Sequence, residues 1–261
     1  METKTSVIWG ATYLRVLPLI AAMAISVPLP AGATNVSSPS AVYIPDRDSI
    51  EVFVIGDDGQ LYDNYWDGSA WQWALLGAPV GHTVRSPNAV YYPTFHSMFV
   101  FVIGDDGHLY VWNGVARAWE DRGVPSGLPN PASSVSSPSA VAMHSLFGGV
   151  DKIAVFVKGD NGRLYAMYLT GTAWGAWEDH TIIYEQDVLV SSLSAVYLFN
   201  TDRLFVTFTS TDGRFCNVVF PSAGYNCISS PVALSSISAV YQPSFNVPLE
   251  KDVAFVIRSV V

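Results

Sequence analysis

Charged residues are scarce in this chain. Asp, Glu, Lys and Arg make up 13% of its 261 residues, about half of the roughly 25% that is typical of soluble domains. The 13 Lys and Arg residues are outnumbered by 22 Asp and Glu residues, which gives a net charge of −9 at pH 7. Because binding to nucleic-acid phosphates needs a basic surface, we expect no nucleic-acid partner. Half of the residues are hydrophobic, which excludes an intrinsically disordered chain.

Long apolar runs are also few. The one near the N-terminus, from Val16 to about Leu29, is shorter than the roughly 20 residues that span a bilayer. It follows two basic residues and precedes Ala31-Gly32-Ala33, whose small side chains fit a signal peptidase. We therefore predict a signal peptide over residues 1–33, a secreted, extracellular mature chain over residues 34–261 and no membrane span. The alternative is an N-terminal membrane anchor.

Cysteine occurs at two positions, Cys216 and Cys227, eleven residues apart. Export places a protein in an oxidising compartment, where disulfides form and persist. We therefore consider these two cysteines a candidate short-loop disulfide. Two buried thiols are the alternative.

Motifs for catalysis or metal binding are missing as well. The chain has no Gly-x-Ser-x-Gly elbow and no phosphate-binding glycine loop ahead of a helix. Its histidines lack the spacing of a metal motif and are expected on the surface or in loops: His82, His96, His108, His144 and His180. We predict that the protein is not an enzyme and has no cofactor or metal.

The chain is instead built from internal repeats. The tripeptide Ser40-Ala41-Val42 recurs with Ala89, Ala140, Ala195 and Ala239 at its centre, and the alanines are 48, 51, 55 and 44 residues apart. Each copy is followed by an apolar run rich in Val and Phe. In the first three copies a turn of Asp, Asp or Asn, and Gly follows, then Leu-Tyr, then a tryptophan-rich segment. A fixed period of this length indicates a repeat architecture.

Each repeat is expected to form four short strands. Aspartates recur between the second and third strands, where they are more typical of hairpin turns than of six- to eight-ligand calcium sites; these are Asp57, Asp58, Asp105, Asp106, Asp160 and Asp212. Four strands in about 50 residues are typical of a β-propeller blade. We predict an all-β propeller of about five blades, with repeats over residues 38–85, 86–136, 137–191, 192–235 and a partial one over 236–261.

The half repeat at the end leaves ring closure open. The last blade has two strands, or the ring is part of a larger one, or a second copy of the chain covers the exposed edge. A homo-oligomer that covers the incomplete last blade is therefore one possible assembly.

The order Ala-Val, Val-Phe-Val-x-Gly-x-Asp, Leu-Tyr and Trp-Asp-Gly-Ser-Ala-Trp resembles the repeats of PLL-type bacterial lectins, over about residues 38–261. More distantly the chain is similar to the five-bladed tachylectin-2. The resemblance implies a propeller that binds fucose, O-methylated or N-acetylated sugars at or between blades. The fungal fucose lectins use an Arg and a Glu in each site, but no arginine recurs at a fixed position here, so that mechanism is not transferred.

Aromatic residues beside polar ones are the candidate sugar ligands. An aromatic ring stacks on the C–H face of a sugar, and Asp, Asn or Glu accepts hydrogen bonds from its hydroxyls. The candidates are Tyr62, Trp66, Asp67, Trp71, Tyr110, Trp112, Asn113, Trp119, Glu120, Tyr165, Trp174, Trp177 and Glu178. For any single tryptophan, packing between blades is the competing interpretation.

These observations favour a secreted, non-catalytic lectin whose partners are glycans or glycoproteins. A second hypothesis is a protein-interaction or structural propeller whose aromatic residues all belong to the core. A third is a sialidase-like glycosidase, which requires an arginine cluster and a tyrosine nucleophile with an acidic partner. The arginines of this chain are few and not aligned between repeats.

Overall fold

The computed structural model describes residues 36–37, 39–126, 128, 134–136, 138–143, 150–180, 190–198, 201–210, 213–221, 224–228, 234–241 and 253–259. The predicted signal peptide lies outside them, as do His144 and Asp212. Among the described residues, no helix combines the length and apolar character that would let it cross a membrane.

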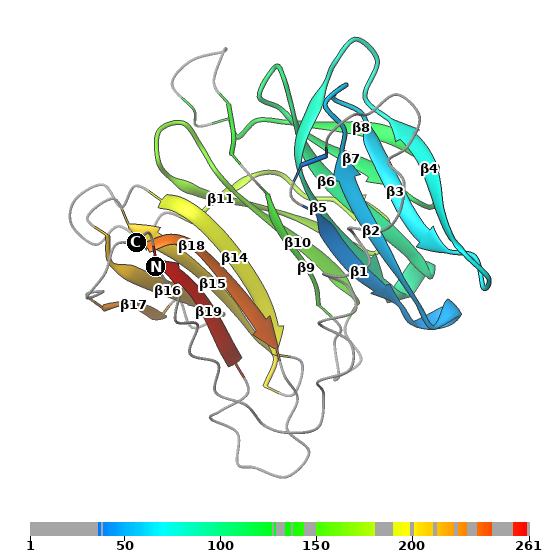
Figure 1. Cartoon of the computed structure of the whole chain (residues 1–261). Coiled ribbons are helices and arrows are strands. Elements are labelled where there is room, and N and C mark those ends of the chain that lie inside the picture. The colour runs from blue at the N-terminus through cyan, green and yellow to red at the C-terminus, as the bar shows by residue number, and fades with distance from the viewer. Residues whose placement is uncertain are drawn as a thin grey trace, which may run out of the picture.

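The described chain is almost entirely antiparallel β-structure, arranged in sheets whose strands follow the order of the sequence (Figure 1). The first sheet contains β1 (Ser40–Ile44), β2 (Ser49–Ile55), β3 (Leu61–Trp66) and β4 (Trp71–Gly77). The second contains β5 (Val84–Tyr92), β6 (Ser97–Gly104), β7 (Leu109–Asn113) and β8 (Ala118–Gly123). Short 3₁₀ helices, η1 (Pro45–Arg47) and η2 (Pro93–Phe95), join the first two strands of these sheets.

The later repeats form similar sheets. The third contains β9 (Ser139–Met143), β10 (Lys152–Lys158), β11 (Leu164–Thr170), β12 (Ala173–Trp174) and β13 (Glu178–Asp179), the last two pairing with β11. The fourth contains β14 (Val190–Leu198), β15 (Arg203–Ser210), β16 (Phe215–Phe220) and β17 (Gly224–Ile228). The last is a two-stranded sheet of β18 (Leu234–Tyr241) and β19 (Val253–Ser259).

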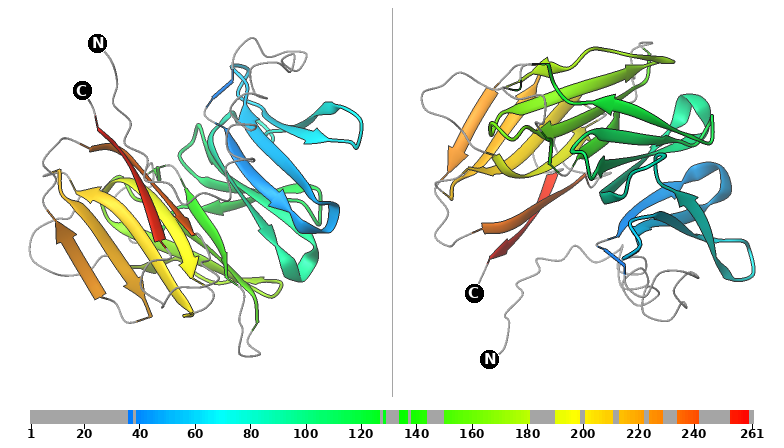
Figure 2. Two further views of the ribbon diagram at one scale, coloured as in Figure 1. Left: turned by 60° about the horizontal axis from the view of Figure 1, so that its bottom comes forward. Right: turned by 90° about the horizontal axis from the view of Figure 1, so that it is seen from above.

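The sheets follow one another around a common centre, as the blades of a propeller do (Figure 2). The first strand of each sheet contacts the first strand of the next, from β1 through β5, β9 and β14 to β18. The predicted all-β propeller is therefore confirmed, while the number of blades stays a prediction.

The recurring Ser-Ala-Val motif has a structural cause. The backbone N–H of Ala89 donates to Ser40 Oγ (2.9 Å), and that of Ala195 donates to Ser139 Oγ (2.8 Å). Between these two pairs, the N–H of Ala140 donates to Asn88 Oδ1 (2.8 Å). A side-chain oxygen at the first motif position thus binds the backbone of the next sheet, where it satisfies an inner-strand amide. Both Ser and Asn carry such an oxygen, which explains why either residue occurs there.

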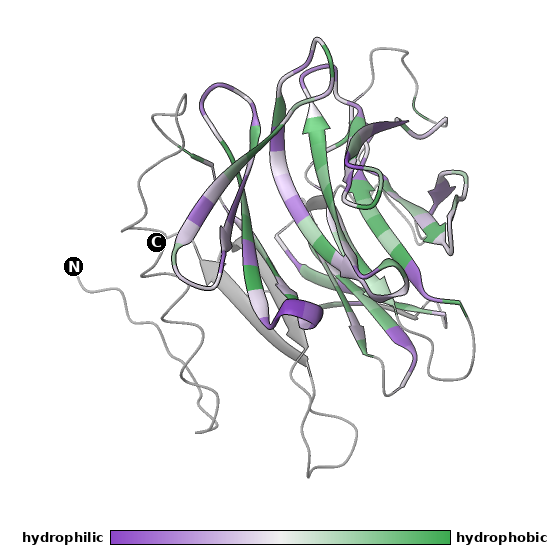
Figure 3. Cartoon of the chain, turned by 90° about the vertical axis from the view of Figure 1, so that its right-hand side faces the viewer, coloured by the Kyte–Doolittle hydropathy of each residue, from purple (hydrophilic) through white to green (hydrophobic). Residues whose placement is uncertain are grey.

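Hydrophobic residues recur along the strands (Figure 3), and their side chains fill the spaces between neighbouring sheets. Phe53, Ile55 and Leu61 of the first sheet pack with Val100 and Val102 of the second. Comparable clusters lie between the second and third sheets and between the third and fourth. Because both faces of a middle sheet are buried, few positions remain for charged residues, which accounts for the low charge content.

One face of the first sheet remains rich in exposed apolar groups. Strand pairing places Trp66 opposite Trp71, Asn64 opposite Trp73 and Tyr62 opposite Leu75, so these residues share the face directed away from the second sheet. Leu75 is 62% exposed and Trp66 is 43% exposed. We call this surface the first-sheet aromatic face.

Candidate functional site

The three candidate tyrosines lie in the core at the start of the third strands. Tyr62, Tyr110 and Tyr165 are at most 5% exposed. Their hydroxyls bind the preceding turn: Tyr62 donates to Asp58 (2.6 Å) and Tyr110 donates to Asp106 (2.8 Å). In the third sheet, Tyr165 accepts a hydrogen bond from Asn161 (2.8 Å). These contacts hold the hairpin turns and commit the three hydroxyls to the fold.

Trp66 and Trp71 form an edge-to-face pair on the first-sheet aromatic face, with ring centroids 5.9 Å apart. The neighbouring Asp67 is committed to the hairpin between β3 and β4. It accepts hydrogen bonds from the backbone of Ala70 and Ser69, the Ser69 hydroxyl and the Gln72 amide. These donors, with the Ala70 N–H first, hold the pKa of Asp67 well below its usual range. Its carboxylate therefore closes a turn while the adjacent rings remain accessible.

Trp112 and Trp119 lie opposite each other on β7 and β8, with ring centroids 5.5 Å apart. Both are partly buried and pack against the cluster between the first two sheets. Trp119 Nε1 also donates to the carbonyl oxygen of Leu76 in the first sheet (3.3 Å). Asn113 caps its turn by accepting from the N–H groups of residues 115 and 116. This pair therefore connects two sheets.

Trp174 and Trp177 lie at the border of the second and third sheets. Trp174 makes an edge-to-face contact with Phe101 of the second sheet, with centroids 6.0 Å apart. Trp177 lies between β12 and β13, and its Nε1 donates to the carbonyl oxygen of Arg122 (3.0 Å). This bond has the same form as that between Trp119 and Leu76, so the last tryptophan of each of these repeats ties its sheet to the preceding one.

Arg122 is a site residue that sequence reasoning missed. Its guanidinium carbon lies 5.3 Å from the ring centre of Trp174, and its Nη2 lies 3.3 Å from Oε2 of Glu120. Both charged side chains are partly exposed, at 21% for Arg122 and 25% for Glu120. Asn113 Nδ2 donates to Glu120 Oε1 (2.6 Å) and orients the carboxylate. Among the described residues, the buried Nε of Arg122 has no hydrogen-bond partner.

The structure thus gathers four polar and aromatic groups between the second and third sheets: Asn113, Glu120, Arg122 and Trp174. We call them the Arg122 cluster. All but Arg122 are candidates from the sequence. Arg122 cannot be recognised from the sequence because it does not recur between repeats. Strand register places Leu76 at its position in the first sheet and His180 at its position in the third.

The other sheets carry different groups at the Arg122 and Glu120 positions. The first sheet has Ala74 and Leu76 there, which offer no side-chain hydrogen bonds. The third has Glu178 and His180, whose carboxylate and Nε2 lie 3.1 Å apart. The ring of His180 also contacts Phe220 of the fourth sheet, with centroids 5.0 Å apart. The same strand position therefore differs chemically from one sheet to the next.

A separate hollow of about 320 Å³ lies where the chain enters the first two sheets. It is lined by Val36, Ser37, Ile55, Gly56, Asp57, Val84 and Arg85. None of the predicted sugar ligands lines it.

The fold is similar to that of several solved structures, lectins among them. A structure of AofleA from Arthrobotrys oligospora matches with a TM-score of 0.56 and 16% identity, over 86% of this chain and 65% of that chain. Aleuria aurantia lectin, as a mutant in complex with α-methyl-L-fucoside, matches with a TM-score of 0.52 and 16% identity, over 79% of this chain and 67% of that one. SapL1 lectin in complex with α-methyl fucoside matches with a TM-score of 0.52 and 14% identity, over 85% and 71%.

A further structure of the Aleuria aurantia lectin is described as a six-bladed β-propeller. This chain spans 65% of the length of AofleA. No family model and no curated protein matches the sequence. The likeness therefore establishes the propeller fold, while the resemblance to PLL-type repeats stays a prediction.

Proposed function

We propose that the protein is a secreted, non-catalytic lectin that binds a fucose-like sugar at the Arg122 cluster. The observation that carries the proposal is the partly exposed Glu120–Arg122 pair beside the Trp174 ring. A carboxylate accepts hydrogen bonds from sugar hydroxyls and a guanidinium donates to them, whereas the indole ring contacts C–H groups.

Two further observations support the lectin proposal. Two of the structures with the same fold are lectins determined with a bound fucoside, namely Aleuria aurantia lectin and SapL1. Cys216 and Cys227 form a disulfide across β16 and β17, which agrees with the pairing considered from the sequence and is typical of exported proteins.

The contacts of the tyrosines and arginines argue against a sialidase-like enzyme. The hydrogen bond to Asp58, together with burial, raises the pKa of Tyr62 to about 12, so its hydroxyl stays protonated at neutral pH. Arg47 pairs with Glu51, Arg85 donates to a backbone oxygen and Arg163 pairs with Asp179. These arginines serve separate parts of the fold, whereas a sialidase requires an arginine cluster.

A glycan array that includes fucosylated, O-methylated and N-acetylated sugars tests the proposal on the mature protein. Titration with methyl α-L-fucoside then compares the wild type with Glu120→Gln, which keeps the side-chain size and removes the charge. We expect a loss of affinity of at least tenfold, since hydrogen bonds to charged groups contribute about 1.5–3 kcal/mol. Asp179→Asn, at an exposed carboxylate that pairs with Arg163 and is not a candidate ligand, is the matched control.

The outcomes separate the function from the site. Absence of binding to any glycan by the folded protein would show that it is not a lectin. Sugar binding that is unchanged in Glu120→Gln would agree with a lectin function but would show that the sugar does not bind at the Arg122 cluster. Trp66→Ala then tests the exposed pair of Trp66 and Trp71 as the alternative platform.

The first-sheet aromatic face supports a second candidate role in protein association. Leu75 (62% exposed) and Tyr43 (52% exposed) lie on this face with Trp66. Asp121 in the second sheet and Asp179 in the third occupy the position of Leu75. Of these three sheets, only the first therefore has an apolar residue there. We propose that a second copy of the chain covers this face. Sedimentation analysis is expected to show a dimer that Leu75→Glu dissociates, and a wild-type monomer at all concentrations would exclude it.

A further inference from the structure

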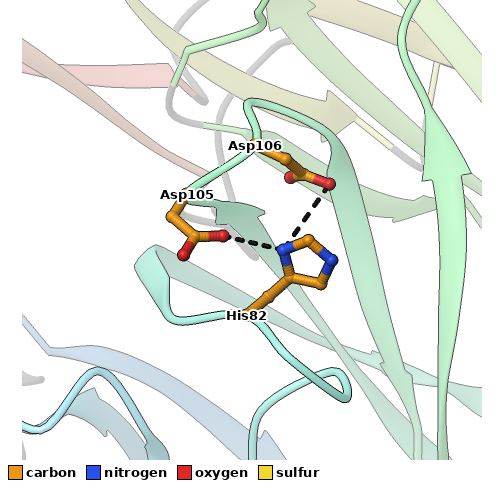
Figure 4. A group of neighbouring side chains, drawn as sticks. All are labelled: His82, Asp105 and Asp106. Atoms are coloured by element: carbon orange, nitrogen blue, oxygen red, sulfur yellow. Dashed lines mark hydrogen bonds and ion pairs between the residues drawn. The ribbon is translucent and has the colours of Figure 1, made fainter.

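A mixed cluster of imidazole and carboxylate groups lies at a turn of the second sheet (Figure 4). His82 comes from the segment between β4 and β5, and Asp105 and Asp106 come from the turn between β6 and β7. His82 Nδ1 lies 2.8 Å from Asp105 Oδ1 and 3.8 Å from Asp106 Oδ2. One donor atom from each of the three side chains lies within 4.8 Å of the others. The three side chains therefore point toward one small volume.

Hydrogen bonds hold each member of this cluster in place. The backbone N–H of Asp105 donates to the carbonyl oxygen of Thr83 (3.0 Å), which fixes the turn against the segment that carries His82. Asp106 Oδ1 accepts from the N–H of His108 (3.1 Å), and Asp106 Oδ2 accepts from the Tyr110 hydroxyl (2.8 Å). Partners of this kind orient the ligands of metal sites.

More donors surround these three residues. His108 Nδ1 lies 3.7 Å from Asp106 Oδ2 and 3.2 Å from Asp121 Oδ2. Arg85, a cationic side chain that bonds to this turn, donates to the carbonyl oxygen of Gly104. One further imidazole and one further carboxylate thus lie beside the three residues.

We propose that His82, Asp105 and Asp106 bind a zinc ion. Imidazole nitrogens and carboxylate oxygens are the donors that zinc combines, whereas calcium takes six to eight oxygens. The ion ties the segment after the first sheet to the second sheet. This site is separate from the Arg122 cluster and does not depend on the lectin function.

The distances from His82 to the two aspartates are near those between the ligands of a zinc ion. Zinc–nitrogen and zinc–oxygen bonds of about 2.0–2.1 Å place neighbouring ligand atoms about 3.3 Å apart. The distances from His82 Nδ1 to the two aspartates, 2.8 and 3.8 Å, lie on either side of that value. Small rotations of these three side chains therefore bring their donor atoms to the spacing of zinc ligands.

No local sequence motif reveals this site, because its ligands come from separate segments. His82 is 23 residues from Asp105, and the two meet only because adjacent sheets bring a linker and a turn together. The aspartates belong to a recurring turn, but the corresponding turn of the third sheet has Asn161 and Gly162 before Arg163 in place of Asp106, Gly107 and His108. The second sheet alone among the described turns therefore carries this donor set.

Isothermal titration of the untagged mature protein with zinc chloride at pH 8 tests the proposal, because neutral imidazole is the ligand form at that pH. We expect one zinc ion per chain and a rise in the unfolding temperature when zinc is added. His82→Ala and Asp105→Asn are each expected to weaken binding at least tenfold. His96→Ala is the matched control, since His96 is an exposed histidine that pairs with one carboxylate, Asp46.

Calcium and magnesium chloride provide the second arm and are expected to give no heat of binding. The proposal is overturned if zinc does not bind, or if it binds to His82→Ala as tightly as to the wild type. It is also overturned if calcium binds at this position better than zinc. Because the ligands are exposed, the variants are expected to stay folded, and circular dichroism verifies this.

Discussion

Asp63 is a buried carboxyl group whose ionisation opposes folding. Its side chain is 6% exposed, and within the described part of the chain its Oδ1 has no hydrogen-bond partner. The corresponding residues that follow the core tyrosine are Val111 and Ala166 in the second and third sheets, both fully buried. Glu51, on the neighbouring strand β2, is also buried and pairs with Arg47. The first sheet therefore carries acidic groups where the other two are apolar.

The raised pKa of Asp63 makes the stability of the protein depend on pH. Burial first, and the charge of Glu51 second, raise the pKa of Asp63 to about 8 in the folded protein. The unfolded chain has the ordinary value of about 3.9, so between about pH 4 and 8 the folded state holds one proton more. Stability contributed by this group therefore falls as pH rises, by about 1.4 kcal/mol per pH unit and by at most about 6 kcal/mol in all.

Asp63→Asn removes the ionisation and keeps the size of the side chain. We expect the variant to match the wild type near pH 4 and to become progressively more stable than the wild type from pH 5 to pH 8. Urea unfolding followed by tryptophan fluorescence measures both proteins at each pH. Asp179→Asn, at an exposed carboxylate that pairs with Arg163, is the control and is expected to change stability by less than about 1 kcal/mol at every pH.

A difference between wild type and Asp63→Asn that stays constant from pH 5 to pH 8 would refute the reasoning. The reciprocal change Val111→Asp, at the corresponding position of the second sheet, is expected to introduce the same pH dependence. A variant that unfolds only above neutral pH agrees with the argument. One that is equally destabilised at pH 4 contradicts it.

Two further predictions concern stability. Trp177→Phe is expected to lower the free energy of unfolding by about 1–2 kcal/mol, because the bond to the Arg122 carbonyl oxygen is lost; urea titration measures the change, and an equal effect of Trp66→Phe, at an exposed ring, would speak against it. Reduction of the disulfide between Cys216 and Cys227 opens a short covalent loop and is expected to lower the free energy of unfolding by about 3 kcal/mol, measured as a lower unfolding temperature in reductant. An unchanged unfolding temperature with both thiols titratable would contradict it.

Much of the fold could be predicted from the sequence because its repeating motifs act locally. The serine or asparagine of the first three Ser-Ala-Val motifs binds the next sheet. The turn between the second and third strands of the first three sheets precedes a tyrosine whose hydrogen bond closes it, as Tyr62 and Tyr165 show. Gly59, Gly107 and Gly162 have positive φ values, which non-glycine residues rarely adopt. Signals of this type depend on a few neighbouring residues, so a single sequence contains them.

The candidate site was only partly predictable because side-chain direction depends on strand register. The pairs Trp66-Asp67 and Trp112-Asn113 look alike in sequence. In the structure, however, the residue of the first sheet that corresponds to Trp112 is Asn64, because Asn64 lies opposite Trp73 as Trp112 lies opposite Trp119. Trp66 is therefore two residues farther along its strand, where it extends beyond the packed core. Arg122 gains its role only because the third sheet places Trp174 beside it.

The strand position of Arg122 shows how a repeating fold acquires a single site. Leu76, Arg122 and His180 occupy one register position of three consecutive sheets, and Ala74, Glu120 and Glu178 occupy another. The backbone at Leu76 and at Arg122 accepts the same kind of hydrogen bond from a tryptophan of the next sheet. These bonds use carbonyl oxygens and not side chains. Side chains at these positions are therefore free to differ without loss of the fold. Ligand specificity in this protein is to be sought where the repeats differ, and stability where they agree.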